Sequence, residues 1–202
     1  MAIIMPPAPL PLRGVKWRLP HADQVNRSGW TGTRKVVGLP GAQLWTATGT
    51  FVTLVGADRA KPWKGFFVAL DGQANRFPLI AVEQRQTTVA NPSVRPGAGN
   101  GGTLPLQGLP TSQTILGVGD AMTVPLPSGH ARKVVLIAPL VSNSQGQAIA
   151  YFGPELGEVP NPGAIVEIGL PYALVSLTSE APGWDVDVGQ TYTFPLAVEE
   201  AK

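Results

Sequence analysis

The chain has 202 residues, of which 44% are apolar and only 14% are charged. This length and apolar content suffice for one large domain, or for a domain with a smaller insert, and exclude a largely disordered chain. The net charge of +2 is too small for the strongly positive surface that nucleic-acid binding requires. Cysteine is absent, which excludes disulfides and thiolate metal sites and fits a protein made in a reducing cytoplasm.

Short strands are predicted along the N-terminal part. The first twelve residues are apolar but contain four prolines and no basic segment, so we expect neither a signal peptide nor membrane insertion. Residues 14–19 alternate between apolar and basic side chains, as a half-buried strand does. Residues 35–37 and 44–52 are rich in β-branched and aromatic residues and predict two further strands. Residues 38–41 between them are typical of a turn.

A single helix is predicted at about residues 58–71. Asp58 is the expected N-cap, which would leave Pro62 in the first turn, where proline costs little. Gly72 is the expected C-terminal stop. The apolar residues recur at helical spacing and predict one stripe against the core: Ala60, Trp63, Phe66, Phe67 and Leu70.

The middle of the chain predicts a small β-barrel or meander. Its expected strands are residues 115–118, 121–126, 133–141 and 147–152, with hairpin turns at 127–130 and 142–146. Two more strands are expected near the C-terminus, at residues 173–177 and 191–198.

Proline- and glycine-rich segments near residues 95 and 165 separate this middle part from the rest. The predicted fold is therefore all-β with one short helix. Residues 1–95 and 166–202 would form a β-sandwich, and residues 96–165 would form a small inserted β-barrel.

One glycine pattern resembles a nucleotide-binding motif only formally. Gly97, Gly99 and Gly102 satisfy G-x-G-x-x-G, but such a motif must open a helix whose N-terminus holds a pyrophosphate. Pro105 and Pro110 follow too closely for a helix to begin there. A loop between domains is the better interpretation, and no cofactor is expected.

Neither the histidines nor the acidic residues form a convincing active site. His21 and His130 fall in different predicted subdomains, and an exposed turn histidine is the expected role of His130. Asp185 and Asp187 would point the same way on a strand and could ligate a hard cation or act with Glu180. Such a pair of aspartates more often simply forms the polar, solvent-facing side of a strand. No serine-nucleophile motif is present, so we predict neither a metal site nor an enzyme.

Aromatic and basic residues suggest contacts with other molecules. Trp17 and Trp45 are expected in the sandwich core, whereas Trp30 lies among Ser, Gly and Thr residues in a loop-like segment. Tryptophan is an effective interface residue, although packing under its own loop is an equal alternative for Trp30. The basic residues are expected on solvated strand faces or against acidic neighbours. The predicted interface residues are Arg13, Arg18, Trp30, Arg34 and Lys35.

Several short motifs occur in a characteristic order along the chain, and none of them is catalytic or specific by itself. They are Arg-Gly-Val-Lys-Trp-Arg (13–18), Leu-Pro-Gly-Ala-Gln-Leu-Trp (39–45), the predicted helix at 63–72, Asn-Arg-Phe (75–77), Gly-Ala-Gly (97–99), Val-Gly-Asp (118–120) and Gly-Trp-Asp-Val-Asp (183–187). In their order and spacing, these motifs resemble the distal tail proteins of phages and prophages of alphaproteobacteria and their relatives.

This resemblance implies a non-enzymatic structural protein of the virion. Copies would form a ring, expected to be a hexamer, at the distal end of a tail, between the tail tube protein and the tail-tip, hub or baseplate proteins. It would be made in the host bacterial cytoplasm, without contact to membrane or nucleic acid. Two alternatives stay open: a carbohydrate-binding β-sandwich module that adheres to host glycans, and another ring of the particle, such as a tail terminator or head–tail connector.

Overall fold

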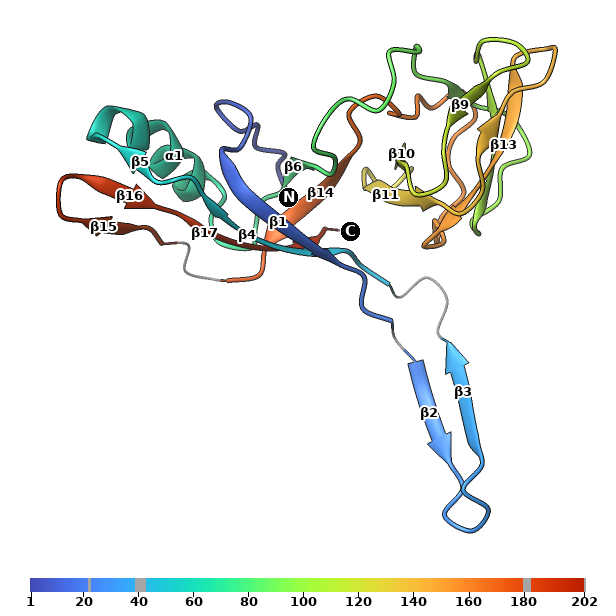
Figure 1. The fold of residues 1–202 in the computed structure, drawn as a ribbon, viewed down its shortest axis with the longest axis horizontal. Coiled ribbons are helices and arrows are strands. Elements are labelled where there is room, and N and C mark those ends of the chain that lie inside the picture. Colours follow the sequence, from blue (N-terminus) through green and yellow to red (C-terminus); the bar gives the residue numbers. More distant parts are fainter. Residues whose placement is uncertain (22, 39–42, 180–182, 202) are drawn as a thin grey trace.

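The computed structural model describes residues 1–21, 23–38, 43–179 and 183–201 of the chain. It is mostly β-structure with one α-helix, as predicted. Two buried clusters form separate cores. One contains residues from both ends of the chain, and we call that part the terminal lobe. The other contains residues between 89 and 168 only, and we call that part the inserted lobe (Figure 1).

A five-stranded antiparallel sheet forms the centre of the terminal lobe, with strand order β1-β4-β17-β14-β6. A smaller sheet of order β15-β16-β5 extends it on one side. The strands are β1 (Leu12–Arg18), β4 (Thr46–Phe51), β5 (Leu54–Val55), β6 (Phe77–Ile80), β14 (Tyr172–Leu177), β15 (Asp185–Asp187), β16 (Thr191–Thr193) and β17 (Pro195–Glu200).

Helix α1 (Ala57–Ala69) covers the terminal-lobe core with its aromatic stripe. The Trp63 ring meets Phe51 edge-on at 4.9 Å between centroids, and Phe67 stacks on Phe194 at 5.4 Å. The prediction of Asp58 as N-cap is wrong, because Gly56 occupies that position with φ 90° and Asp58 instead pairs with Lys61 at 2.7 Å. Since the helix begins at Ala57, Pro62 lies beyond its first turn, contrary to expectation.

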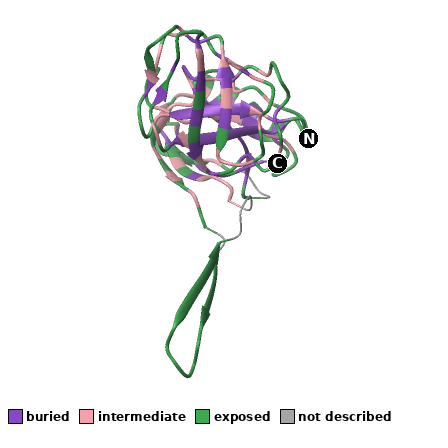
Figure 2. Ribbon diagram, turned by 90° about the vertical axis from the view of Figure 1, so that its right-hand side faces the viewer, coloured by how far each residue is buried: buried purple, intermediate pink, exposed green. Residues whose placement is uncertain are grey.

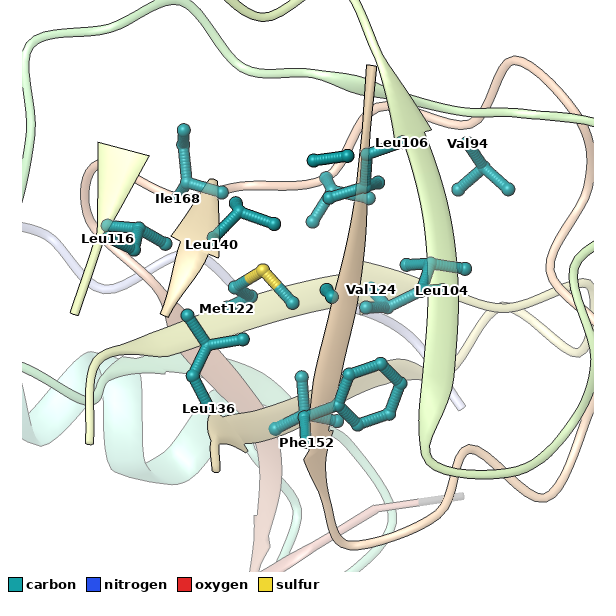
Figure 3. Packing of buried hydrophobic residues seen from close by; sticks show 14 of the residues in the cluster. Val94, Leu104, Leu106, Leu116, Met122, Val124, Leu136, Leu140, Phe152 and Ile168 are labelled. Atoms are coloured by element: carbon teal, nitrogen blue, oxygen red, sulfur yellow. The ribbon is translucent and has the colours of Figure 1, made fainter. Parts of the chain in front are cut away.

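The inserted lobe is built on a second five-stranded antiparallel sheet, of order β10-β11-β13-β8-β7, with the pair β9–β12 beside it. Its core is mainly aliphatic (Figure 3). The strands are β7 (Ser93–Val94), β8 (Thr103–Gln107), β9 (Thr114–Leu116), β10 (Ala121–Pro125), β11 (Ala131–Leu136), β12 (Leu140–Val141) and β13 (Gln147–Gly153).

Two features of the inserted lobe bear on the sequence predictions. Strand β8 follows the glycine-rich segment at 97–102, so no helix begins there and a dinucleotide motif is not formed. The turn at 127–130 joins β10 to β11 as expected. Residues 39–41 of the turn predicted at 38–41 lie outside the described residues.

Polar contacts join the lobes where β10 meets β14. The Thr123 hydroxyl donates to the Tyr172 carbonyl at 2.6 Å and accepts from the Tyr172 N–H at 2.7 Å. In the described chain, α1 is the one helix, and no helix there is long and apolar enough to cross a bilayer.

Candidate interaction surface

A β-hairpin projects from the terminal lobe (Figure 1). Strands β1 and β4 pair as far as Arg18 and Thr46, and between these residues the chain leaves the sheet. It then forms β2 (Asp23–Arg27) and β3 (Arg34–Gly38), which pair only with each other. We call residues 23–38 the arm hairpin. Figures 1 and 2 both show it standing away from the two lobes.

The arm hairpin is exposed along its whole length. Every residue from 24 to 38 is exposed, and Figure 2 shows the arm in the colour of exposed residues throughout. This includes the cross-strand pair Val25 and Val36, whose exposed fractions are 50% and 47%. A lone two-stranded hairpin is at best marginally stable in water. Both faces of the arm are therefore open to solvent, and burial of the valine pair against a partner would stabilise the hairpin.

Trp30 stands at the tip of the arm and is 97% exposed. The loop beneath it is ordered by local hydrogen bonds. The Ser28 N–H donates to the Thr33 carbonyl at 3.0 Å, and the Ser28 hydroxyl accepts from the Thr31 N–H at 3.1 Å. Gly32 has φ 68°, a left-handed conformation that glycine adopts without strain. The tip thus holds a large indole ring in water, where it packs under no part of its own loop.

Basic side chains follow the arm. Arg27 lies directly opposite Arg34 in the register of β2 and β3. Like charges at such positions repel, and no carboxylate among the described residues forms an ion pair with either of them. Lys35 belongs to the other face, opposite Asn26. An anionic partner would relieve the repulsion between the two arginines.

All five residues predicted to contact partners are exposed. Arg18 ends β1 at the base of the arm and Arg13 lies near the other end of β1, whereas Arg34, Lys35 and Trp30 lie on the arm itself. The structure brings the last three together on one projecting element. Their contact with other chains stays a prediction.

A second group of polar side chains is buried where the two lobes meet. Glu200 at the end of β17 accepts from Arg132 Nη1 at 2.7 Å and from the Lys133 N–H at 3.1 Å. The Trp45 N–H donates to the same carboxylate at 3.1 Å. His130 Nε2 lies 3.3 Å from the second carboxylate oxygen. Glu200 belongs to the terminal lobe, whereas His130, Arg132 and Lys133 belong to the inserted lobe, so this junction cluster of four residues joins the two lobes.

Lys133 places its ammonium between two indole rings. Its Nζ lies 3.5 Å from the centroid of Trp17 and 4.1 Å from that of Trp45, and Trp45 Nε1 donates to the Lys133 carbonyl at 2.9 Å. Burial lowers the pKa of Lys133 to about 7, against the opposing effects of Glu200 and Glu83. Burial likewise lowers the pKa of Arg132, although Glu200 opposes this.

Two sequence predictions are corrected at this junction. His130 is 2% exposed, so it is not an exposed turn histidine. It faces Glu200 because β11 begins at the boundary between the lobes. The core prediction for Trp17 and Trp45 holds only in part: both are half-buried with their rings against Lys133, and Trp17 packs against the edge of the terminal-lobe core.

An open depression of about 400 Å³ lies beside the junction, lined in part by Arg85, Asn91, Glu167 and Tyr172. Glu167 is already engaged there: it accepts from Asn91 Nδ2 at 2.5 Å and from the N–H groups of residues 169 and 170. Burial acts to raise the pKa of Glu167, but these hydrogen bonds and the charge of Arg85 outweigh it, and the pKa is lowered. The carboxylate in this depression is therefore held by hydrogen bonds within the chain.

The remaining candidates from the sequence are dispersed. Asp185 and Asp187 lie on exposed strand β15, as expected. Glu180 is outside the described residues, so its proposed action with them is not placed. His21 lies 2.9 Å from Gln43 Nε2. Among residues 1–21, 23–38, 43–179 and 183–201, no three acidic or histidine side chains gather as a metal site would require.

Strand β2 and Arg27 were missed by the sequence prediction. The signal was present: Val25 and Val36 flank the segment Ser-Gly-Trp-Thr-Gly-Thr (28–33), which is rich in turn-forming residues. Such a pattern indicates a hairpin. However, neither face of β2 is buried, so the strand contains polar residues such as Gln24 and Asn26 and lacks an apolar face that would identify it.

Comparison with known proteins does not assign this surface. The chain matches no protein-family model and no curated protein.

Proposed function

We propose that the protein is a non-enzymatic structural subunit of a phage-like particle, whose copies form a ring at the distal end of the tail. In this role it would join the tail tube protein to the tail-tip, hub or baseplate proteins. The proposal rests first on the resemblance of the motifs from residue 13 to residue 187, read in their order along the chain.

The observation that carries the proposal is the arm hairpin. It exposes a tryptophan, a valine pair and three basic side chains on an element that does not pack on its own lobes. Exposed aromatic and arginine side chains are the residues that dominate protein–protein interfaces. An arm that reaches beyond its own body suits a subunit whose neighbours complete its surroundings.

The test has two measurements. Mass photometry and negative-stain microscopy of the purified protein are expected to show rings, and a variant in which residues 23–38 are replaced by a short Gly-Ser turn should remain monomeric with an unchanged fold. Gold labels on a tagged copy in intact particles should mark the distal tail tip. A label at the neck would instead support a tail terminator or connector, and a chain that never joins particles would refute the proposal.

A second function is favoured by one observation, the 97% exposure of Trp30. An exposed indole can stack on a sugar ring, so a glycan-binding role on the host surface fits the same residue. Glycan arrays with wild-type and Trp30→Ala protein separate the two. Specific sugar binding that the substitution removes would favour adhesion, whereas an absence of sugar binding together with ring formation would favour the structural role.

A further inference from the structure

The hairpin β15–β16 carries an acidic face at another extremity of the molecule. We call residues 185–193 the acidic hairpin. Asp185 and Asp187 alternate with Val186, so the two carboxylates share one face of β15. Val186 pairs with Tyr192, whose ring lies under the ammonium of Lys64 at 4.3 Å. The side with Val186 and Tyr192 therefore faces helix α1, and the side with the two aspartates faces solvent.

These aspartates lack cationic partners within the described chain. Neither forms an ion pair there, and the one side-chain hydrogen bond of Asp187 is to the neighbouring Val188 N–H, at 2.7 Å. Elsewhere in the described chain, Asp58 pairs with Lys61 and Glu200 pairs with Arg132. The acidic hairpin is thus a compact pair of uncompensated negative charges.

The arm hairpin offers the complementary pattern. Arg27 and Arg34 are side by side across β2 and β3, and Asp185 and Asp187 are two residues apart along β15. Such positions are both separated by about 5–7 Å, so two guanidinium groups can each meet one carboxylate, a pairing that arginine makes with good geometry. Val25 and Val36, on the same face of the arm as the two arginines, add exposed apolar area.

One copy cannot make this contact with itself. Figure 1 shows the acidic hairpin at the left end of the long axis and the arm hairpin projecting from the opposite half of the molecule. A contact between these two surfaces must therefore join different copies. It uses a different patch on each partner, and such head-to-tail contacts generate closed rings or open filaments.

We propose that the arm hairpin of one copy binds the acidic hairpin of the next, through Arg27 and Arg34 on the arm and Asp185 and Asp187 on β15. This inference rests on the proposed ring and identifies the surfaces that close it. Residues 23–38 of one copy form one side of the proposed interface, and residues 185–193 of the next copy form the other side.

Charge reversal tests the contact. The arm variant carries Arg27→Glu and Arg34→Glu, and the end variant carries Asp185→Lys and Asp187→Lys. Each variant alone would place like charges against one another at every contact, so each is expected to lose self-association by at least a hundredfold. Mixed in equal amounts they should assemble again, because the acidic arm of one fits the basic end of the other, and such rings must contain an even number of subunits.

Matched controls separate this contact from a change in net charge. Arg59→Glu with Lys61→Glu on α1 repeats the charge change of the arm variant, and Glu155→Lys with Glu199→Lys repeats that of the end variant, all at exposed residues. Both controls should assemble like wild type. Circular dichroism and thermal unfolding should show that every variant keeps its fold, which is expected because all the substituted residues are exposed.

The outcomes distinguish the inference from the proposed function. Assembly that is lost in each reversed variant and restored when the two variants are mixed supports the contact. Wild-type rings that both reversed variants still form would overturn the contact and leave the ring function standing, with the arm bound elsewhere, for example to the tail tube protein. Wild-type protein that stays monomeric both in solution and in particles would overturn both.

Discussion

Two β-hairpins of this chain have the same length and opposite surroundings. The hairpin β10–β11 and the arm hairpin each contain five facing residue pairs in antiparallel register. In the first, nearly every strand residue is buried in the inserted-lobe core or at the junction of the lobes; in the second, every residue from 24 to 38 is exposed. Backbone pairing is therefore common to both, and side-chain burial is what differs. The first hairpin stabilises the fold, whereas the second is available to stabilise an assembly.

The largest effect is expected at the junction cluster. Arg132→Met removes the cation that pairs with Glu200 at 2.7 Å and leaves a buried carboxylate with weaker compensation. Breaking a buried pair in this way typically lowers the free energy of unfolding by about 3–5 kcal/mol. Urea unfolding measures the loss. Lys61→Met, which breaks the exposed pair with Asp58, is the control and should change stability very little. Equal stabilities of the two variants would contradict a structural role for the cluster.

A matched valine pair tests the comparison of the hairpins directly. Val134→Ala on β11 removes two methyl groups from a fully buried site and should lower the free energy of unfolding by about 2 kcal/mol, with a further loss from the cavity. Val36→Ala on β3 makes the same change on an exposed strand and should stay within about 0.5 kcal/mol of wild type. Chemical denaturation of the monomeric protein decides between them, and a large effect of Val36→Ala would mean that the arm packs on its own body.

Stability is expected to rise with pH above neutrality because of Lys133. Its pKa is about 7 in the folded protein and 10.5 at its ordinary value. Between these values the unfolded chain binds more protons than the folded one, so the free energy of unfolding increases as the pH rises from about 7 towards 10. Lys133→Met should remove this part of the increase. Denaturation midpoints at several pH values for both proteins provide the measurement, and identical slopes would show that the ammonium is not desolvated.

The smallest effect on folding is expected at the tip of the arm. Trp30→Ala should leave the unfolding transition unchanged, because the indole is 97% exposed. It should nevertheless weaken self-association by about tenfold or more, since a tryptophan that enters an interface usually contributes that much. Sedimentation velocity over a concentration series measures the association. Loss of stability without loss of association would place Trp30 in local packing, the alternative that its sequence context also allows.

Local patterns predicted the elements that bury one face. The stripe from Ala60 to Leu70 predicted α1, and the alternation at 14–19 predicted β1, because burial of one face imposes a period on the sequence. The same rule explains the failure at β2, where no face is buried and no period is imposed. The sequence prediction placed the N-cap at Asp58, but the helix is capped two residues earlier by Gly56, without a side-chain hydrogen bond. Helix ends are set by local geometry, so a sequence pattern locates them only to within one or two residues.

The residues of the candidate interface were likewise predicted only in part. Trp30, Arg34 and Lys35 were identified from residue type and turn context alone, while Arg27 was missed, since only the register of β2 with β3 places it opposite Arg34. The junction cluster was not foreseen at all. His130, Arg132 and Glu200 are separated by up to 70 positions in the sequence, and nothing local indicates that β11 and β17 meet.

The amino-acid sequence by itself determined an all-β chain with one helix, a middle segment set apart by proline and glycine, and a tryptophan in a loop-like segment. These are properties of short segments, and segment propensities and periodicity act within a few residues. Only the tertiary structure decided that two lobes share a buried carboxylate, that Lys133 lies between two indoles, and that an arm hairpin and an acidic hairpin stand at different extremities. Those features depend on contacts between distant segments, whose positions follow from strand order and register.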